Sequence, residues 1–304
     1  MITPEEAIER IGARFGVHSG RRALHARGVV VGGSFTASAE GGALTTAPHM
    51  SGEPVEVIAR FSNGSGDPDE PDKAPDVRGL AVRFELPGGG RTDIVAQTAP
   101  RFPVKTPDAF VELIEATARG PQMLIKLPLF LARNPGAVPA LRANAAALRP
   151  PRSYAQPAYF AIHAYRWIDA GGTSRWVRYT LSPASEQPTA APDREVPDYL
   201  SAELRDRFAA GGTVQFDLDL EIAGAGDDAH DPTSVWSSAE RVVAGRLSFD
   251  RLVDGREDTI FDPMRLIDGI EPSEDPILRF RPRAYGVSYA RRTGDPTEPP
   301  SWAQ

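Results

Sequence analysis

Eight short segments with the composition of β-strands constrain the fold of this chain more than any other feature. Glycine and proline separate them, and several alternate apolar and polar residues, as strands with one buried face do. They lie at residues 28–38, 55–62, 80–86, 93–97, 159–169, 174–181, 213–222 and 242–249. An antiparallel sheet of this size is large enough to close on itself. We therefore predict an eight-stranded antiparallel β-barrel.

Helical patterns fall between and after these segments. Residues 110–117 carry apolar side chains at helical spacing, and residues 140–148 are rich in alanine. Residues 198–208 and 275–292 also have helical character. The predicted fold class is thus α+β, a barrel with additional helices. We expect residues 1–304 to form a single domain.

The composition excludes several kinds of protein. Cysteine is absent, which rules out disulfides, thiolate metal sites and cysteine nucleophiles. The formal net charge of −7 argues against nucleic acid or an anionic membrane as the main partner. The first residues are charged throughout and lack the apolar core of a secretory signal. We therefore expect a cytoplasmic protein with neither a nucleic-acid nor a membrane partner.

Common catalytic motifs do not occur in the sequence. There is no HExxH, no GxSxG and no GxxxxGK[ST]. The five histidines are scattered without metal-ligand spacing, so a zinc enzyme is not expected. One of them, His25, lies in RRALHARG (21–28), just ahead of the first predicted strand. The segment alone favours a solvated loop histidine over a functional one.

A second group of residues lies near the end of the chain, in ILRFRPRAYGVSYARR (277–292). Arg281 and Tyr285 are four apart, so they share one face of a helix. A tyrosine ordinarily has a pKa of about 10, and an adjacent guanidinium favours its charged form. A phenolate beside an arginine is the chemistry of a tyrosine-ligated haem iron. Taken alone, the pair fits an ordinary amphipathic helix better.

These two groups belong to a series of six segments in one fixed order. The series is RRALHARG (21–28), ARFSNGSG (59–66), DVRGLAVRFELPGGGRTDIVAQTAPRF (76–102), HDPTSVWSS (230–238), FDPMRLIDGIEPSEDPILRFRPRAYG (261–286) and SYARR (288–292). It resembles the haem catalase family, whose members carry V-H-A-[KR]-G, R-F-S, D-x-R-G-[FL]-A-[VT]-[KR]-F, D-x-T-K-V-W and F-[DN]-P…R…AY segments. The resemblance covers most of positions 20–294.

The resemblance implies roles on both sides of a haem. His25 matches the distal histidine above the haem, and Ser62 matches the serine that hydrogen-bonds the far nitrogen of that imidazole. Tyr285 matches the tyrosinate that binds the iron. Arg281 matches the arginine that keeps this tyrosine ionised.

It also implies how the rest of the cofactor is held. Arg22, Arg60 and Arg292 match the arginines that bind the haem propionates, a pairing that suits guanidinium geometry. Phe102 and Phe110 fall where the family packs aromatic rings over the distal pocket and the haem edge.

Three positions modify this pattern. Leu24 lies where a small aliphatic residue narrows the peroxide channel. Gln97 stands where the family has a distal asparagine, so the amide is kept but reaches one methylene further. Pro282 lies between Arg281 and Tyr285. Because a proline inside a helix costs about 3 kcal/mol and one backbone hydrogen bond, we expect a kink or a restart there.

The implied function is the reduction of peroxides. His25 would take a proton from the inner peroxide oxygen and return it to the outer one, a step that contributes about 10²- to 10⁴-fold. The chain stops soon after the ligand helix, so we expect a minimal catalase-related haem peroxidase with weak or modest catalase activity. Its substrates would be hydrogen peroxide, organic hydroperoxides and small organic electron donors. We expect haem b, no NADPH and a homodimer.

Other interpretations remain. A true catalase would release oxygen from hydrogen peroxide without oxidising organic donors. A fatty-acid hydroperoxide isomerase would favour threonine beside the distal histidine, where this chain has Leu24. A haem carrier or sensor needs no distal base, and the presence of His25 with Ser62 and Phe102 argues against it.

Overall fold

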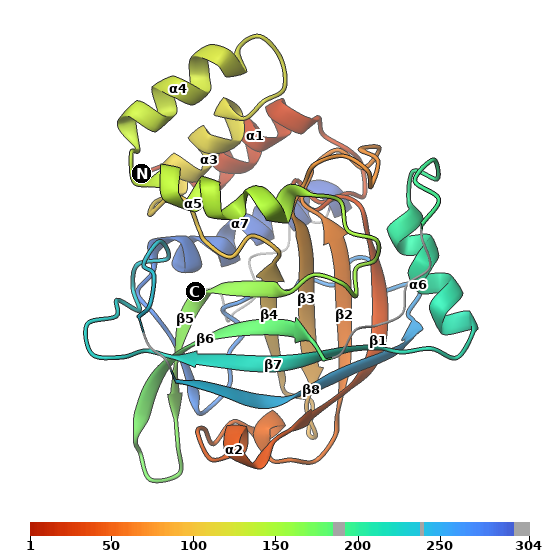
Figure 1. The fold of residues 1–304 in the computed structure, drawn as a ribbon, viewed down its shortest axis with the longest axis vertical. Coiled ribbons are helices and arrows are strands. Elements are labelled where there is room, and N and C mark those ends of the chain that lie inside the picture. Colours follow the sequence, from red (N-terminus) through yellow and green to blue (C-terminus); the bar gives the residue numbers. More distant parts are fainter. Residues whose placement is uncertain (185–191, 238–239, 295–304) are drawn as a thin grey trace.

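The computed structural model describes residues 1–184, 192–237 and 240–294, and its centre is a single β-sheet. The strands are β1 (Gly28–Ala37), β2 (Val55–Asn63), β3 (Arg78–Glu85), β4 (Arg91–Gln97), β5 (Tyr159–Ile168), β6 (Ser174–Pro183), β7 (Val214–Ile222), β8 (Arg241–Leu252) and β9 (Ile270–Pro272). The eight predicted segments all form strands (Figure 1). The three-residue β9 was not predicted.

The sheet closes into the predicted eight-stranded barrel. Its order is β4-β3-β2-β1-β8-β7-β6-β5-β9, and every pairing is antiparallel. Gln97 at the end of β4 lies opposite Phe160 in β5, and this pairing joins the two halves of the barrel. The β9 strand adds to the free side of β5. Gln97 therefore lies at the seam of the barrel.

The interior of the barrel is filled by side chains. β7 alternates buried and partly exposed residues along its whole length, so that one face points inward. Aromatic rings from four strands meet inside, with centroid separations of 5.7–6.2 Å among Phe61, Tyr159, Phe216 and Phe249. Each such buried side chain contributes roughly 1.5–3 kcal/mol. Since the interior is packed, a bound group must lie outside it.

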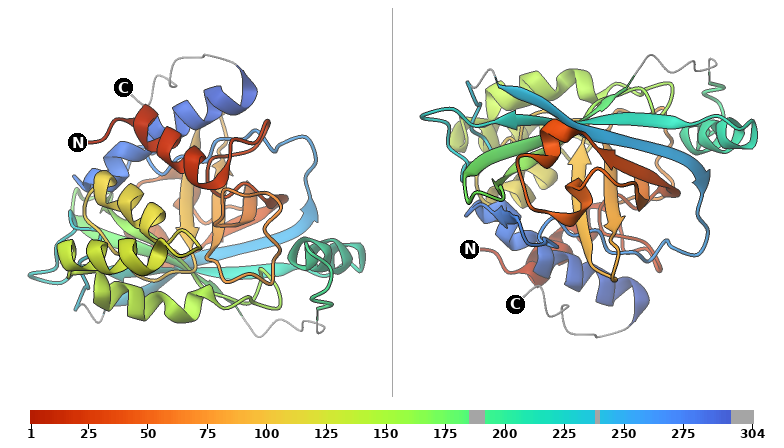
Figure 2. Two further views of the ribbon diagram at one scale, coloured as in Figure 1. Left: turned by 90° about the horizontal axis from the view of Figure 1, so that it is seen from above. Right: turned by 90° about the horizontal axis from the view of Figure 1, so that it is seen from below.

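Helices surround the barrel. They are α1 (Pro4–Phe15), α2 (Ala39–Gly42), α3 (Pro107–Ala116), α4 (Met123–Arg133), α5 (Ala137–Asn144), α6 (Tyr199–Ala209) and α7 (Pro276–Thr293), with short 3₁₀ turns at Pro48–Met50 and Ala145–Leu148. Figure 2 shows α1, α3 and α7 packed together beside the barrel. The predicted helices α3, α5, α6 and α7 are confirmed, whereas α1 and α4 were not predicted. No helix in the described ranges is long and apolar enough to cross a membrane.

Local sequence signals define α1 and α7. Thr3 and Glu6 form a capping box at the start of α1, each bonding the other's backbone N–H. Asp275 caps α7 by accepting hydrogen bonds from the backbone N–H groups of Ile277 and Leu278. The expected restart at Pro282 does not occur, because α7 continues through it to Thr293. Proline removes only one hydrogen bond, and packing against α1 and α3 supports the rest of the helix.

Candidate active site

One wall of the candidate site is the outer face of β2, β3 and β4. In β2, Ala59 and Phe61 point into the barrel core, so Arg60 and Ser62 point outward. The same alternation turns Gly79 in β3 and Gln97 in β4 to the outer face. Side chains thus alternate along these strands between the barrel interior, which they fill, and the outer face, where small and polar side chains form a wall of the site.

His25 lies against this wall, in the loop that enters β1. Its Nδ1 is 3.0 Å from the Ser62 hydroxyl, and its backbone N–H donates to the Gly64 carbonyl at 3.1 Å. Its φ of +56° is the only positive value at a non-glycine residue in the described part of the chain. Gly79 lies beneath the ring, where a Cβ atom would be 2.8 Å from both Nδ1 and the Ser62 hydroxyl. The imidazole is therefore fixed by its backbone, a hydrogen bond and a close glycine.

The electrostatic environment keeps this histidine neutral. Burial, reinforced by the positive charges of Arg60 and Arg281, lowers the pKa of His25 to about 3. Nδ1 is engaged by Ser62, and Nε2 has no hydrogen-bond partner among the described residues. Nε2 is thus the ring nitrogen that remains for proton transfer within the cavity.

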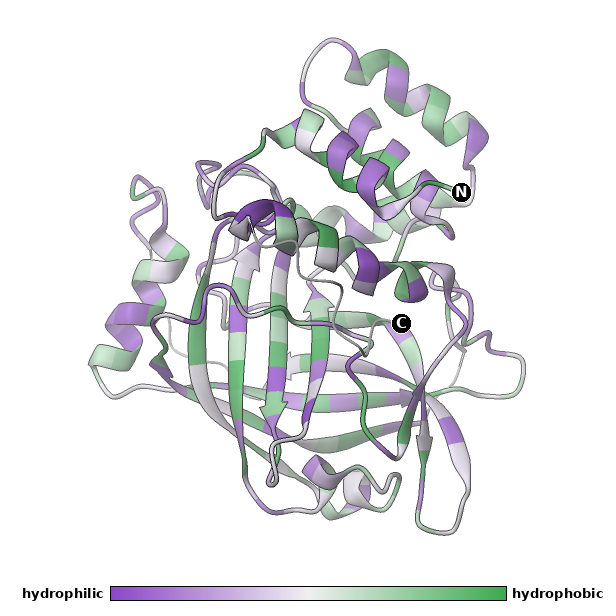
Figure 3. Cartoon of the chain, turned by 180° about the vertical axis from the view of Figure 1, so that it is seen from behind, coloured by the Kyte–Doolittle hydropathy of each residue, from purple (hydrophilic) through white to green (hydrophobic). Residues whose placement is uncertain are grey.

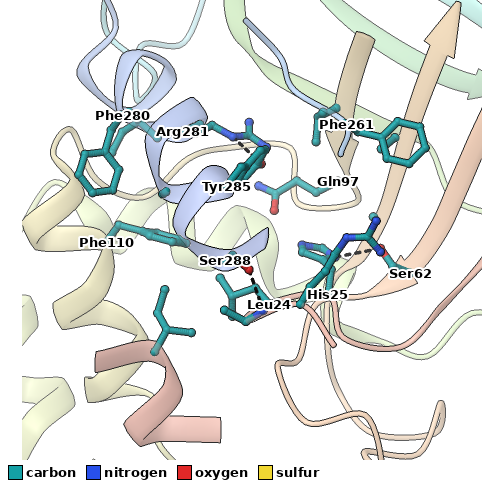
Figure 4. Close-up of a pocket in the computed structure, with 18 of the residues that line it drawn as sticks. Leu24, His25, Ser62, Gln97, Phe110, Phe261, Phe280, Arg281, Tyr285 and Ser288 are labelled. Atoms are coloured by element: carbon teal, nitrogen blue, oxygen red, sulfur yellow. Dashed lines mark hydrogen bonds between the residues drawn. The ribbon is translucent and has the colours of Figure 1, made fainter. Parts of the chain in front are cut away.

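The opposite wall is one face of α7. Arg281, Tyr285, Ser288 and Arg292 follow one another at spacings of four, three and four, which places them on a single face. Arg281 donates to the Tyr285 hydroxyl from Nε at 2.8 Å and also from Nη2. The Ser288 hydroxyl accepts from the backbone N–H of Ala23 at 3.3 Å, so α7 is tied to the loop that carries His25 (Figure 4).

Three guanidinium groups gather at one end of the cavity. Burial and then the charges of Arg60 and Arg292 lower the pKa of Arg22 to about 8. Burial also lowers the pKa of Arg60 to about 10. The buried Nε atoms of Arg60 and Arg292 have no hydrogen-bond partner among the described residues, where the carboxylate oxygens of Glu257 and Asp258 lie 3.8 Å from them. Excess positive charge with unused donors is the chemistry of an anion site.

The two walls face each other across one cavity. All ten sequence-predicted site residues line it: Arg22, His25, Arg60, Ser62, Gln97, Phe102, Phe110, Arg281, Tyr285 and Arg292. Leu24 lines it as well, and the rings of Phe102 and Phe110 stack at 5.3 Å. Figure 4 shows His25, Gln97 and Tyr285 directed into this one space.

The sequence did not predict two other parts of the lining. His163 of β5 bonds Asp275 with 2.6 Å between Nδ1 and Oδ2, and the His163 Nε2 has no partner among the described residues. The register of β5 shifts between Ala161 and Tyr165, and such an irregularity redirects side chains. The second part comes from α1, which contributes Ile8 and Ile11. The proline and capping box at the start of α1 were the available signal.

Comparison with known proteins identifies the family. A family model described as Catalase matches residues 17–298. The chain belongs to the catalase family. Its relatives in this family include a catalase-related peroxidase of Mycolicibacterium paratuberculosis, 44% identical over 96% of both chains. A catalase-related peroxidase of Synechococcus elongatus is 32% identical over 96% of this chain and 89% of its own.

Longer catalases match over part of their length. A Vibrio cholerae catalase is 28% identical over 90% of this chain, but the match covers 58% of that catalase. The crystal structure of a fungal catalase superposes with a TM-score of 0.77 at 22% identity, covering 93% of this chain and 60% of the fungal one. The barrel and its associated helices are therefore a catalase fold.

Membership of the catalase family implies a haem cofactor, and the cavity fits one. A macrocycle needs apolar walls, which Phe102, Phe110 and the α1 isoleucines provide. Its two carboxylates need cations, and the buried Arg60 and Arg292 have unused Nε donors. The phenol of Tyr285 lies on one wall and the imidazole of His25 on the other. A planar cofactor between the walls would therefore have one functional side chain next to each of its faces.

Proposed function

We propose that this chain is a haem-dependent peroxidase that reduces hydrogen peroxide and organic hydroperoxides with small organic electron donors. That it is an oxidoreductase acting on peroxide follows from its family and from two relatives named catalase-related peroxidase. The observation that carries the finer proposal is a neutral histidine and an arginine-paired tyrosine on opposite walls of one apolar cavity. Modest catalase activity accompanies the peroxidase activity.

The residues that hold the cofactor follow from their chemistry. Tyr285 would bind the iron of haem b, and Arg281 donates two hydrogen bonds to the same oxygen. Arg22, Arg60 and Arg292 bind the propionates. When bound, the haem supplies the redox chemistry that breaks the peroxide O–O bond.

The distal residues move and direct the proton. His25 accepts the proton of the inner peroxide oxygen at Nε2 and delivers it to the outer oxygen, so that water or an alcohol leaves. Ser62 is a positioning residue, because it holds Nδ1 and with it the plane of the ring. The Gln97 amide donates a hydrogen bond to the peroxide. Phe102 and Phe110 exclude water from the reacting atoms.

The apolar lining of the cavity supports a preference for apolar hydroperoxides. Ile8 and Ile11 of α1, Leu24 of the distal loop and Phe280 of α7 line the cavity with aliphatic and aromatic surface. An apolar substituent on the peroxide gains about 25 cal/mol for each Å² that it buries there. Hydrogen peroxide gains nothing from the same surface, so the organic substrate is favoured.

An absorption spectrum and steady-state kinetics test the proposal. We expect a high-spin ferric haem spectrum, and donor oxidation with an organic hydroperoxide that is faster than oxygen release from hydrogen peroxide. His25→Ala should lower turnover by about 10²-fold or more with haem content unchanged. Tyr285→Phe should lose haem or change its spectrum. Oxygen release that exceeds donor oxidation would indicate a true catalase instead.

A further inference from the structure

The helix α4, MLIKLPLFLAR, is apolar apart from Lys126 and Arg133, although it lies on the surface. Its inner face packs against the core cluster around Phe102, where Phe130 is buried and Leu127 and Leu131 are partly buried. A helix that is apolar all round is normally enclosed by protein or lipid. Figure 1 shows α4 at the outer edge of the molecule beyond α3, which contacts both α4 and α1, and Figure 3 shows the hydrophobic residues of the chain in green.

No described residue covers the outer face of α4. Leu124 is 76% exposed, Ile125 72% and Leu129 49%. Pro128 and Ala132 are exposed too. Because successive residues are rotated by about 100° about the helix axis, both lie on the same face of the helix, between Leu124 and Leu129. An exposed apolar patch of this kind on a protein surface marks an interaction site.

The charged residues of the segment that contains this helix have one sign. Between Glu115 and Asp169 the sequence has seven arginine and lysine residues and no carboxylate, although the whole chain has a net charge of −7. Lys126 and Arg133 are seven apart, so they lie along the same edge of the α4 outer face. Both are exposed, and neither has an acidic group within 4 Å in the part of the chain that the structure describes.

We infer that the outer face of α4 docks on an anionic phospholipid surface. Helices that lie in the plane of a membrane place leucine-type side chains below the headgroups and lysine or arginine at the headgroup level. An anionic surface attracts each nearby cation, which corresponds to about a fivefold gain in affinity per residue. With eleven residues α4 is too short to span a bilayer, so the association is peripheral.

A second copy of the chain fits this face less well. A symmetric dimer through α4 would place Lys126 and Arg133 near the same cations of the other copy, with no carboxylate on this segment to pair with them. The net charge of −7 argues against an anionic partner for the molecule as a whole. The segment between Glu115 and Asp169, however, has a net positive charge. Docking here does not depend on the proposed peroxidase function.

Vesicle sedimentation tests the inference directly. The purified full-length, haem-loaded chain is mixed with phosphatidylcholine vesicles with or without phosphatidylglycerol, at low and high salt. We expect sedimentation only with the anionic vesicles, weakened by salt. Ile125→Ser with Leu129→Ser should reduce binding at least tenfold. Lys126→Gln with Arg133→Gln should reduce it by about the fivefold per cation stated above.

A matched control separates this face from general surface hydrophobicity. Val235→Ser with Val243→Ser removes two other exposed apolar side chains, 59% and 48% exposed, and should leave binding unchanged. Equal binding to both vesicle types, or unchanged binding of the Ile125/Leu129 variant, would overturn the inference. The inference would also be overturned if the wild-type chain formed a dimer and did not bind vesicles, and if the Ile125/Leu129 variant were monomeric. The α4 face would then be a contact between two copies of the chain.

Discussion

At the level of single residues, the cavity is organised around a histidine in a left-handed backbone conformation. His25 has φ of +56°, in a region that only a few per cent of non-glycine residues occupy, although asparagine, aspartate and histidine do so more often than the others. Hydrogen bonds from its backbone to Gly64 and from its ring to Ser62 hold it there. Such conformations persist where the surrounding structure enforces them, and they concentrate at functional sites. The strain therefore belongs to the positioning of the imidazole.

This backbone strain is measurable by comparing two substitutions at one position. His25→Ala retains the left-handed strain, whereas His25→Gly relieves it, so the glycine variant should be more stable by about 1 kcal/mol. Chemical denaturation of both variants measures the difference. The neighbouring Ala26→Gly is the control, and it should be destabilising by about 0.5–1 kcal/mol. If glycine and alanine at position 25 gave equal stability, the φ of His25 would carry no strain.

Gly79 provides a second test at the same scale. A Cβ atom at this position would lie 2.8 Å from both the His25 Nδ1 and the Ser62 hydroxyl, so Gly79→Ala must displace one of them. We expect peroxide turnover to fall about tenfold or more while haem content is retained, because catalysis depends on the placement of the ring. Gly90→Ala is the matched control, since its Cβ has only ordinary contacts of 3.5 Å or longer. Full activity of the Gly79 variant would show that the ring tolerates movement.

At the level of elements, strands were easier to predict than the helices that complete the site. β7 shows why, because strict alternation of Val214, Phe216, Leu218, Leu220 and Ile222 marks one buried face without any tertiary information. The helix α4 carries Pro128 and only two polar residues, Lys126 and Arg133, so its sequence resembles a simple apolar run. The motif-bearing residues of the cavity were predicted from the family resemblance. Ile8, Ile11 and His163 were not, because only the packing of distant elements brings them there.

The pairing of β1 with β8 depends on a glycine at position 33. The register of this pair shifts between Gly32 and Gly33, and a Cβ at Gly33 would lie 1.9 Å from the Ser248 carbonyl oxygen. Because that oxygen is backbone, the clash cannot be relieved by a side-chain rotation. Gly33→Ala should lower the free energy of unfolding by about 3 kcal/mol. Gly136→Ala, with nothing within 4 Å and φ of −63°, should be neutral. Equal effects in denaturant titrations would contradict this account of the strand contact.

At the level of the whole molecule, buried titratable groups on several elements set the response to acid. Burial lowers the pKa of His25, His49 and His163. Because the unfolded chain then binds protons that the folded chain does not, each of these histidines lowers the free energy of unfolding as the pH falls below about 6.5, the pKa of histidine in the unfolded chain. Burial has the opposite effect on carboxyls, raising the pKa of Asp93 and bringing that of Asp262 to about 6. These acids take up protons in the folded state first and offset part of the loss. The dependence of the free energy of unfolding on pH is therefore the difference between the contribution of the buried histidines and that of the buried carboxyl groups.

His49 allows one contribution to be isolated. It is 2% exposed, its Nδ1 has no hydrogen-bond partner in the described part of the chain, and its ring centroid lies 4.8 Å from that of Phe84, which like His49 is not among the residues that line the cavity. Burial lowers its pKa to about 4, so between about pH 6.5 and pH 4 only the unfolded chain binds the proton. The wild-type chain should therefore lose roughly 3 kcal/mol relative to His49→Leu across this range, at about 1.4 kcal/mol per pH unit. Denaturant titrations of both proteins at several pH values measure the difference, and a separation that stays constant with pH would show that His49 is protonated in the folded barrel.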